Sequence, residues 1–410
     1  MSDAWIVNHG VDTLVVNAYY LDRYGKLLKR EIDADLSMQL EDWKREAQGI
    51  HEPVRTSLIF NGLPLIMQPN GAGQGQYPFM LKTEDITLYV STGKWNGIAS
   101  VRFNSSFLWS SPSVRDAVGQ VQVLLDNLFK DEMYLQPSAI DLCADVAGWQ
   151  DIESLDRNQH FVSRSRKRSE HATPDWGYDA GTSEHSYGLQ STGFEFSPHG
   201  AMSAIIYDKT REIQKSGKEW VPDLWYANGY TELDGRVRRV EIRYKRAALH
   251  ELMQEERFHG VENVYTLLDL LPLLWAYGVG QVEGGPDGLP DGWLRCVIPG
   301  KDKTRSRWLT HPVWKVVQGA FSVPGQKPEQ FGKIVRKRHR DRNVNKGVEA
   351  VMGYLTSLAA WVEDEVGADA DLSVVLSWFH EKGNSYLDRL GRDFVEEVAS
   401  KRRAIQRADV

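Results

Sequence analysis

Two short stretches decide the fold of this chain: residues 202–208, Met-Ser-Ala-Ile-Ile-Tyr-Asp, and residues 238–245, Arg-Arg-Val-Glu-Ile-Arg-Tyr-Lys. The first is an apolar run that ends in a tyrosine and an aspartate. The second alternates with a period of two, so its valine and isoleucine share one face and its charged residues share the other. The two stretches predict neighbouring β-strands, separated by a polar excursion over residues 209–237.

The charged residues of these stretches suggest a chemistry. Glu241 lies between Arg239 and Arg243, and neighbouring positive charge keeps a carboxylate ionised, so this glutamate could hold a metal ion. Tyr207 is followed by Lys209, and a phenol beside cations and a bound divalent ion can attack a phosphodiester. The alternative is an ordinary solvated strand face, which the same alternation of aromatic and charged residues also fits.

A third stretch, residues 138–149, carries two aspartates inside an apolar run. The spacing from Asp141 to Asp145 is even, so on a strand both carboxylates point to the same face. Aspartate is disfavoured inside strands and rarely buried without a partner, so this pair calls for a cation. The cation is Mg²⁺ or Mn²⁺ in one interpretation. In the other, Asp141 pairs with an arginine and Asp145 ends the strand.

Together these motifs resemble the replication initiation factor family, the rolling-circle initiators and relaxases of the Rep_trans type. The resemblance lies in residues 207–212 (Tyr-Asp-Lys-Thr-Arg-Glu), 239–243 (Arg-Val-Glu-Ile-Arg) and 140–145 (Ile-Asp-Leu-Cys-Ala-Asp). It covers roughly residues 130–250 well. The family's arginine before the upstream strand is Ala139 here, and the turn at 197–200 departs from the usual Gly-Ser form.

The resemblance implies an α+β fold with a central antiparallel sheet flanked by helices. It implies that Tyr207 cuts one DNA strand and stays joined to the 5′ phosphate, with Lys209 stabilising the developing charge and Glu212 orienting the lysine. It also implies that Mg²⁺ or Mn²⁺ is held by three carboxylates, those of Asp141, Asp145 and Glu241. The partners would be origin DNA, as a single strand or hairpin at the nick site, and a host helicase.

Two other functions stay open from the sequence. The chain could recognise an origin or repress a gene with this fold and without cleavage, its carboxylates serving only as ion-pair partners. It could also be a metal-dependent nuclease in which water replaces the tyrosine as nucleophile.

Composition limits the class of protein. With 410 residues, 41% hydrophobic residues and 14 tryptophans, the chain can bury a sizeable core. Cys143 and Cys296 are its only cysteines, which argues against structural zinc and a disulfide framework and favours a reducing cytoplasm. The sequence shows neither an apolar stretch of membrane-spanning length nor a signal peptide.

The formal charge of −7 argues mildly against a protein that coats nucleic acid. For binding at a single DNA site, the positions of the cations matter more than the net charge. Local basic clusters on an acidic chain suit docking at one DNA site, although charge runs are more often solvated faces. The cations predicted to contact DNA are Arg164, Arg166, Lys167, Arg168, Arg239, Arg243, Arg336, Lys337, Arg338 and Arg340.

The organisation expected along the chain has three parts. Residues 1–112 are expected to be rich in β-strands, with a helix over residues 37–48 and a meander of short antiparallel strands between residues 54 and 109, and the core with the tyrosine and glutamate strands fills residues 113–279. The linker at 280–292, rich in glycine, proline and aspartate, marks a boundary. Residues 280–410 are then expected to form a mainly helical module.

Overall fold

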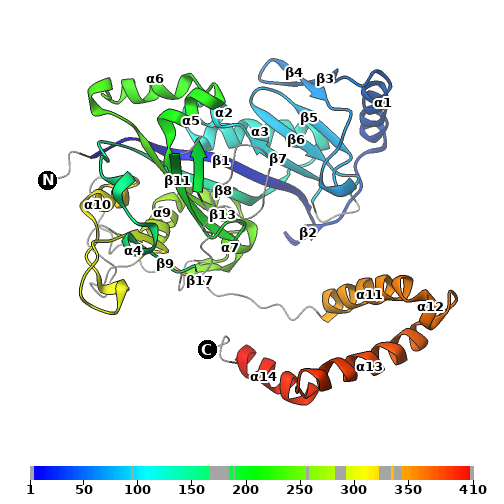
Figure 1. Cartoon of the computed structure of the whole chain (residues 1–410). Coiled ribbons are helices and arrows are strands. Elements are labelled where there is room, and N and C mark those ends of the chain that lie inside the picture. Colours follow the sequence, from blue (N-terminus) through cyan, green and yellow to red (C-terminus); the bar gives the residue numbers. More distant parts are fainter. Residues whose placement is uncertain are drawn as a thin grey trace. The chain divides into compact units, whose positions relative to one another are not determined.

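The computed structural model describes residues 4–93, 97–165, 184–187, 190–254, 258–281, 292–322, 334–336 and 344–406. The chain divides into two compact units, residues 1–338 and residues 339–410 (Figure 1). The first unit is built on a large sheet. The described part of the second consists of helices.

The sheet of the first unit has 12 strands, and all of its pairs are antiparallel. Its order is β10-β11-β12-β13-β8-β1-β7-β6-β5-β4-β3, with β2 paired to β1. The strands are β1 (Trp5–Leu21), β2 (Leu27–Leu28), β3 (Val54–Phe60), β4 (Leu63–Met67), β5 (Phe79–Lys82), β6 (Ile86–Val90), β7 (Ala99–Phe103), β8 (Tyr134–Ala147), β10 (Glu184–Tyr187), β11 (Gln190–Phe196), β12 (Met202–Asp208) and β13 (Arg238–Lys245).

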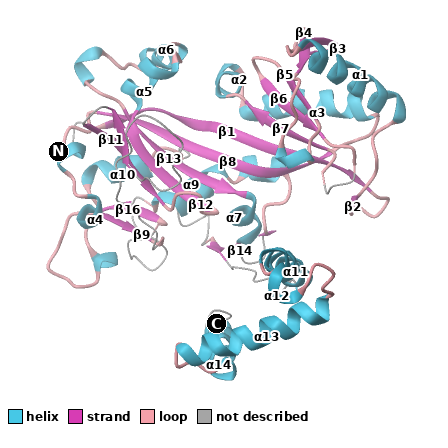
Figure 2. Cartoon of the chain, turned by 45° about the vertical axis from the view of Figure 1, so that its right-hand side comes forward, coloured by secondary structure: helices cyan, strands magenta, loops and turns pink. Residues whose placement is uncertain are grey.

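Helices cover both faces of this sheet. Figure 2 shows α9 and α10 on one side of the long strands and α5 and α6 on the other. The helices of the first unit are α1 (Ala34–Ile50), α2 (Ser105–Ser110), α3 (Val114–Phe129), α4 (Arg157–His160), α5 (Lys209–Ser216), α6 (Trp220–Ala227), α7 (Arg246–Glu251), α8 (Val264–Asp269), α9 (Leu271–Val279) and α10 (Pro312–Gln318). The predicted α+β class, with a central antiparallel sheet flanked by helices, is confirmed.

Two smaller sheets lie beside the large one. One pairs β9 (Phe161–Ser163) with β16 (Leu294–Cys296), and the other has the order β15-β14-β17, with β14 (Leu252–Gln254), β15 (Phe258–His259) and β17 (Val335–Arg336). A single helix is predicted over residues 246–258. The structure instead ends α7 at Glu251 and continues as β14, whose residues Leu252 and Gln254 are buried.

Strand β13 lies inside the sheet, between β12 and β8, and its two faces differ in character. Val240, Ile242 and Tyr244 are fully buried and face α9. Gly278 of α9 comes so close that an added Cβ would lie 2.9 Å from Ile242, which is why this helix needs a residue without a side chain at the contact. The Tyr244 hydroxyl donates a hydrogen bond to the Leu274 carbonyl at 2.6 Å. The opposite face of β13 carries the charged residues.

The helix boundaries follow from capping. The sequence after Ser113 has the apolar spacing of a helix with this serine as its cap, and the Ser113 hydroxyl does accept from the Asp116 amide at the start of α3. The sequence predicts the first helix over residues 37–48 with Ser37 as its cap, but α1 begins at Ala34 because Asp33 supplies the cap. A proline inside the apolar run from residue 261 to 277 predicts a break, and Pro272 does lie where α8 ends and α9 begins.

The boundary between the units differs from the one expected at residue 280. Residues 292–322 belong to the first unit, because β16 pairs with β9 and α10 packs on α9. The indole of Trp314 is fully buried and donates to the Val279 carbonyl at 2.9 Å. The second unit therefore begins at residue 339 and contains α11 (Val344–Trp361), α12 (Glu363–Val366), α13 (Leu372–Arg389) and α14 (Phe394–Gln406). Within the described part of the chain, no helix combines the length and the apolar character needed to span a bilayer.

Candidate active site

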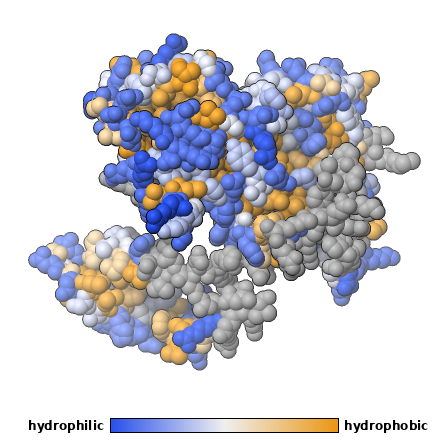
Figure 3. All heavy atoms as spheres, turned by 180° about the vertical axis from the view of Figure 1, so that it is seen from behind, coloured by the Kyte–Doolittle hydropathy of each residue, from blue (hydrophilic) through white to orange (hydrophobic). Residues whose placement is uncertain are grey.

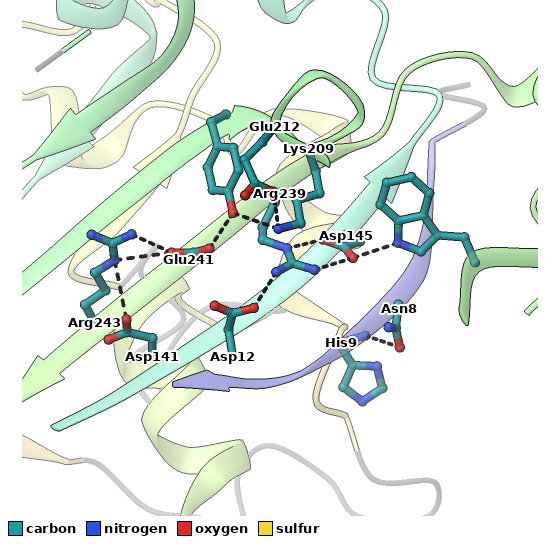
Figure 4. Close-up of polar contacts among 12 residues, drawn as sticks. Asn8, His9, Asp12, Asp141, Asp145, Lys209, Glu212, Arg239, Glu241 and Arg243 are labelled. Atoms are coloured by element: carbon teal, nitrogen blue, oxygen red, sulfur yellow. Dashed lines mark hydrogen bonds and ion pairs between the residues drawn. The ribbon is translucent and has the colours of Figure 1, made fainter. Parts of the chain in front are cut away.

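The charged residues gather on the face of the sheet opposite α9, over four adjacent strands. In the register of β12, β13 and β8, Tyr207 lies opposite Arg239, which lies opposite Asp145, and Arg243 lies opposite Asp141. Residues directly opposite each other in a sheet point to the same face. The predicted strand pairing therefore brings the tyrosine, the arginines and the carboxylates into one cluster (Figure 4).

At the centre of the cluster is a chain of three side chains. The Tyr207 hydroxyl donates to Oε1 of Glu241 at 2.7 Å. The other oxygen of this carboxylate accepts from Arg243, at 2.7 Å from Nη2 and 3.2 Å from Nε. Only 2% of Glu241 is exposed, whereas 36% of the Arg243 side chain is exposed. This is the arrangement that a nucleophile, a base in contact with it and a third residue orienting the base would need.

The protonation states of this pair follow from its surroundings. Burial raises the pKa of the Tyr207 phenol well above its usual value, and the charge of Glu241 raises it further, against the opposing effect of Arg239. Burial would also raise the pKa of the Glu241 carboxyl, but Arg243 and Arg239 outweigh burial and hold that pKa below its usual value. At neutral pH the phenol therefore holds its proton, and an ionised carboxylate is placed to accept it.

Lys209 reaches the same hydroxyl from the helix that follows the strand. The Asp208 carboxylate caps α5 by accepting from the Arg211 amide at 3.0 Å, so the helix begins two residues after the tyrosine. The Lys209 ammonium lies 3.5 Å from the Tyr207 hydroxyl and 2.5 Å from Glu212. Lys209 is 1% exposed, whereas 31% of the Glu212 side chain is exposed. The sequence-predicted trio of Tyr207, Lys209 and Glu212 is thus brought together.

Asp145 does not take the position expected of a metal ligand. Its two oxygens accept from Arg239, at 2.6 Å from Nε and 2.8 Å from Nη2, and Oδ2 also accepts from the Trp225 indole at 2.8 Å. Arg239 donates in addition to Asp12 at 2.6 Å (Figure 4). Arg239 is itself 1% exposed, so it supplies fixed positive charge beneath the tyrosine instead of the phosphate contact expected of it.

The three predicted metal ligands therefore do not fit a divalent ion as they are arranged. The oxygens of Asp145 and Glu241 are engaged by arginine, indole and phenol donors. Among the described residues, no group of three or more His, Cys, Asp or Glu side chains is placed to hold a metal. Asp141 is 3.7 Å from Arg243. Burial, followed by the charge of Glu241, raises the pKa of the Asp141 carboxyl to about 7.

Sequence reasoning missed three residues of the site. Asp12 lies at an irregularity between Val11 and Thr13 in the pairing of β1 with β8, about 130 residues before its neighbours on β8. Trp225 belongs to α6, where its spacing looks like that of a packing residue. Gly193 lies opposite Tyr207, and an added Cβ would be 2.3 Å from the Ile206 carbonyl and 2.7 Å from Cβ of the tyrosine. This glycine lets β11 approach the tyrosine closely.

The remaining cations predicted to contact DNA lie away from this cluster or outside the described residues. The Arg164 guanidinium is 5.7 Å from the ring centroid of Tyr277. Arg336 pairs with Glu251 at 2.6 Å on β17. The residues outside the described part are Arg166, Lys167, Arg168, Lys337, Arg338 and Arg340.

Comparison with known proteins gives little beyond this geometry. No family model and no curated protein matches the chain. Among solved structures, the chain is similar to a rolling circle replication initiator protein from Geobacillus stearothermophilus. The identity is 13%, the match covers 76% of this chain and 95% of that one, and the TM-score is 0.38. A likeness of this size carries no argument about the site, so function has to be argued from the side chains.

Proposed function

We propose that this protein cuts one strand of DNA with Tyr207 and stays joined to the 5′ phosphate, as an initiator of rolling-circle replication or a relaxase. The observation that carries the proposal is the 2.7 Å hydrogen bond from the Tyr207 hydroxyl to an ionised, arginine-held Glu241. A phenol with a raised pKa is a poor nucleophile by itself, so it needs a group that takes up its proton as the new bond forms, and the Glu241 carboxylate is in hydrogen-bond contact with it.

In this mechanism Glu241 accepts the phenolic proton while the Tyr207 oxygen attacks phosphorus. The new bond joins the tyrosine oxygen to phosphorus, and the bond from phosphorus to the 3′ oxygen breaks. The 3′ oxygen leaves on the opposite side and takes a proton from water to become a free 3′-OH, and Glu241 returns its proton to the solvent, so no net proton is gained or lost. Breakage and joining conserve the phosphoester, so the reaction needs no nucleotide hydrolysis.

Three cations stabilise the negative charge that develops in this step. Lys209, at 3.5 Å, and Arg239, which lowers the pKa of the phenol, both favour the tyrosine oxygen as it loses its proton. Arg243 is partly exposed at the rim of the cluster and can meet the phosphate once Glu241 becomes neutral. The Mg²⁺ or Mn²⁺ that the family resemblance implies has no part in these steps, because its predicted ligands are engaged by arginines.

A denaturing gel tests the proposal directly. The protein is incubated with labelled single-stranded oligonucleotides and with supercoiled DNA from its own genetic element, and the products are separated in detergent. We expect a labelled covalent adduct whose modified tryptic peptide contains Tyr207. Free nicked products would indicate water as the nucleophile, and unbroken DNA that is nevertheless bound would indicate a non-cleaving recognition protein.

A further inference from the structure

The N-terminal half of the sheet, from β3 to β7, has one buried face and one more open face. Leu65, Leu81 and Val101 belong to the buried face and are fully buried in the hydrophobic core. Helix α1 packs on this side, where its Lys44 lies over the ring of Phe79. Antiparallel sheets commonly have one face on the core and one in solvent. What the open face can do therefore depends on the side chains that it carries.

Strands β3 to β7 contain three charged residues, and all three are cations: Arg55, Lys82 and Arg102. The whole chain has a formal charge of −7, so five strands without a single carboxylate are unusual in it. All three side chains are exposed. Among the residues that the structure describes, none of the three forms an ion pair. The arginines near Tyr207 differ in this respect, because carboxylates hold them.

The strand register places these cations in one line. The paired positions across the sheet are Arg55, Ile66, Lys82, Thr87, Arg102, Val15, Ala139 and Lys245, in that order. Residues opposite each other point to the same face. Arg55, Lys82, Arg102 and Lys245 therefore form a single line, here called the basic row. Neighbouring strands are about 4.8 Å apart, so the row extends over about 30 Å from β3 to β13.

The basic row ends beside the tyrosine cluster. Lys245 is exposed and lies on the same face of β13 as Arg243, two residues or about 7 Å along the strand. Arg243 holds the Glu241 carboxylate, and that carboxylate accepts the hydrogen bond from Tyr207. A ligand that follows the row from β3 thus arrives at the reactive groups on the face where they lie.

The next line on the same face adds a second kind of contact. Tyr89 lies opposite Ser100, which lies opposite Asn17. The half-buried ring of Tyr89 is accompanied by that of Tyr77, with 6.0 Å between the ring centroids. Proteins that bind single-stranded nucleic acid combine cations that follow the backbone with aromatic rings on which bases stack. The open face carries both.

Exposed cations on a strand are ordinary by themselves. Figure 3 shows hydrophilic residues over much of the surface of the first unit, and charged strand faces are usually only solvated. The basic row differs from a solvated face in three ways: its five N-terminal strands carry no carboxylate, its cations are aligned by the register, and it continues to the tyrosine cluster. Unneutralised cations in a line suit a ligand with regularly repeated negative charge.

We propose that the basic row binds the phosphates of a single DNA strand, in the segment that continues from the phosphate cut by Tyr207. One line of cations matches one phosphate backbone, whereas a duplex carries phosphates on two strands. The inference rests on the proposed function for the position of the cut, but binding to the row does not require cleavage. It assigns the part of the substrate that lies beyond the reacting bond.

Binding of oligothymidylates to the full-length protein, measured by fluorescence anisotropy over a salt series, tests this. Every variant also carries Tyr207→Phe, so that a failure of the chemistry cannot be mistaken for a failure of binding. The test variant combines Arg55→Gln, Lys82→Gln and Arg102→Gln. We expect its affinity for an oligothymidylate of about 30 nucleotides to fall at least about tenfold at low salt. The slope of log affinity against log salt should fall by about 2, or about 0.7 for each lost contact on a single strand.

Two matched variants separate the basic row from total charge and from structure. Arg45→Gln, Arg115→Gln and Lys315→Gln together remove the same charge from α1, α3 and α10, and should leave the slope unchanged. Arg55→Lys, Lys82→Arg and Arg102→Lys together keep the charge of the row, and should keep the slope of the parent protein.

An unchanged slope in the test variant would overturn the proposal. So would an equal fall in the variant of the three helices, since total charge would then explain the effect, or a loss that appears with duplex DNA and not with a single strand. If the expected losses are seen but the protein with its tyrosine intact forms no adduct on a denaturing gel, the binding role of the basic row stands and the proposed cleavage is wrong.

Discussion

Tyr207 and Tyr244 lie on neighbouring strands of the same sheet, and their hydroxyl groups meet opposite environments. Tyr244 points to the α9 side, where it is fully buried and donates to the Leu274 carbonyl. Tyr207 points to the other side and donates to the Glu241 carboxylate. Burial raises the pKa of both phenols well above the usual value. The difference lies in the acceptor: a helix carbonyl cannot take the proton, whereas an ionised carboxylate can. One face of the sheet therefore contributes to the hydrophobic core, and the other carries the groups that the proposed reaction would use.

The largest expected effect comes from exchanging the two tyrosines for phenylalanine. Tyr207→Phe should lower covalent adduct formation by at least about a thousandfold, because the attacking oxygen is lost. Tyr244→Phe should keep the adduct and cost only about 1 kcal/mol of unfolding free energy for one buried hydrogen bond. Adduct yield on denaturing gels and DNA affinity by fluorescence anisotropy check both variants. Equal adduct yield in Tyr207→Phe would move the nucleophile to another tyrosine.

Removing the base gives the next largest effect. Glu241→Gln should slow adduct formation by about 10²–10⁴-fold while DNA affinity changes little, because an amide cannot accept the phenolic proton. Glu195→Gln is a matched control: Glu195 lies opposite Ile205 on the adjacent strand and faces the same side, but not the phenol. The two variants are compared in single-turnover kinetics with excess protein. A loss in Glu195→Gln equal to that in Glu241→Gln would point to general electrostatics and away from a specific base.

A cavity made on the α9 side of the sheet should lower the stability of the fold without changing the rate of adduct formation. Ile242→Ala removes a fully buried side chain between β13 and α9, and should lower the free energy of unfolding by about 2–5 kcal/mol. Adduct formation per folded molecule should stay within about twofold at low temperature. Urea unfolding followed by fluorescence measures the first quantity, and titration of active sites measures the second. A large kinetic defect in this variant would show that the two faces are not independent.

The smallest effect concerns Asp141, whose carboxyl has a pKa of about 7 in the fold and about 4 in an unfolded chain. Between these values the folded state holds a proton that the unfolded state has lost, so unfolding free energy falls as pH rises from about 4 to 7. Asp141→Asn lacks this penalty. It should be more stable than the wild type at pH 8, by about 2–4 kcal/mol, and equally stable near pH 4. Melting curves in EDTA at both pH values test this, and a constant difference would contradict it.

The sequence predicted the part of the site that depends on local pattern. The alternation of β13 put Arg239, Glu241 and Arg243 on one face, and the strand ending at Tyr207 was expected beside it. Lys209 and Glu212 are three residues apart, a spacing that meets on one side of a helix turn. These relations join residues that are close in the sequence, so they can be predicted without knowing how the strands pair.

The remaining parts of the site depend on contacts between distant segments. The sequence gives no sign that Asp145 meets Arg239, because this pairing is set by the register of β8 with β13. The even spacing from Asp141 predicted the correct face for Asp145. That its partner is Arg239, and not a metal ion, depends on the register between β8 and β13. The contact between the Trp225 indole and Asp145 could not be predicted either, since an indole on a short helix is usually a packing residue. The boundary at 280 was misplaced because a segment rich in glycine and proline can also join two parts of one unit.

The irregularity in β1 makes chain length, as well as residue identity, a determinant of the site's charge. Two residues of β1, Val11 and Asp12, span one step of the pairing with β8. Loss of Asp12 would let Val11 and Thr13 pair regularly with Leu142 and Asp141, so the earlier residues would keep their partners on β8 and only the carboxylate would be lost. Loss of Gly10, with the extra residue kept, would instead shift the residues before it by one place. His9, whose ring now packs against Phe321, would then turn toward the arginines. A library of single-residue deletions across residues 5–15 should therefore show a sharp loss of function at positions where substitutions are tolerated.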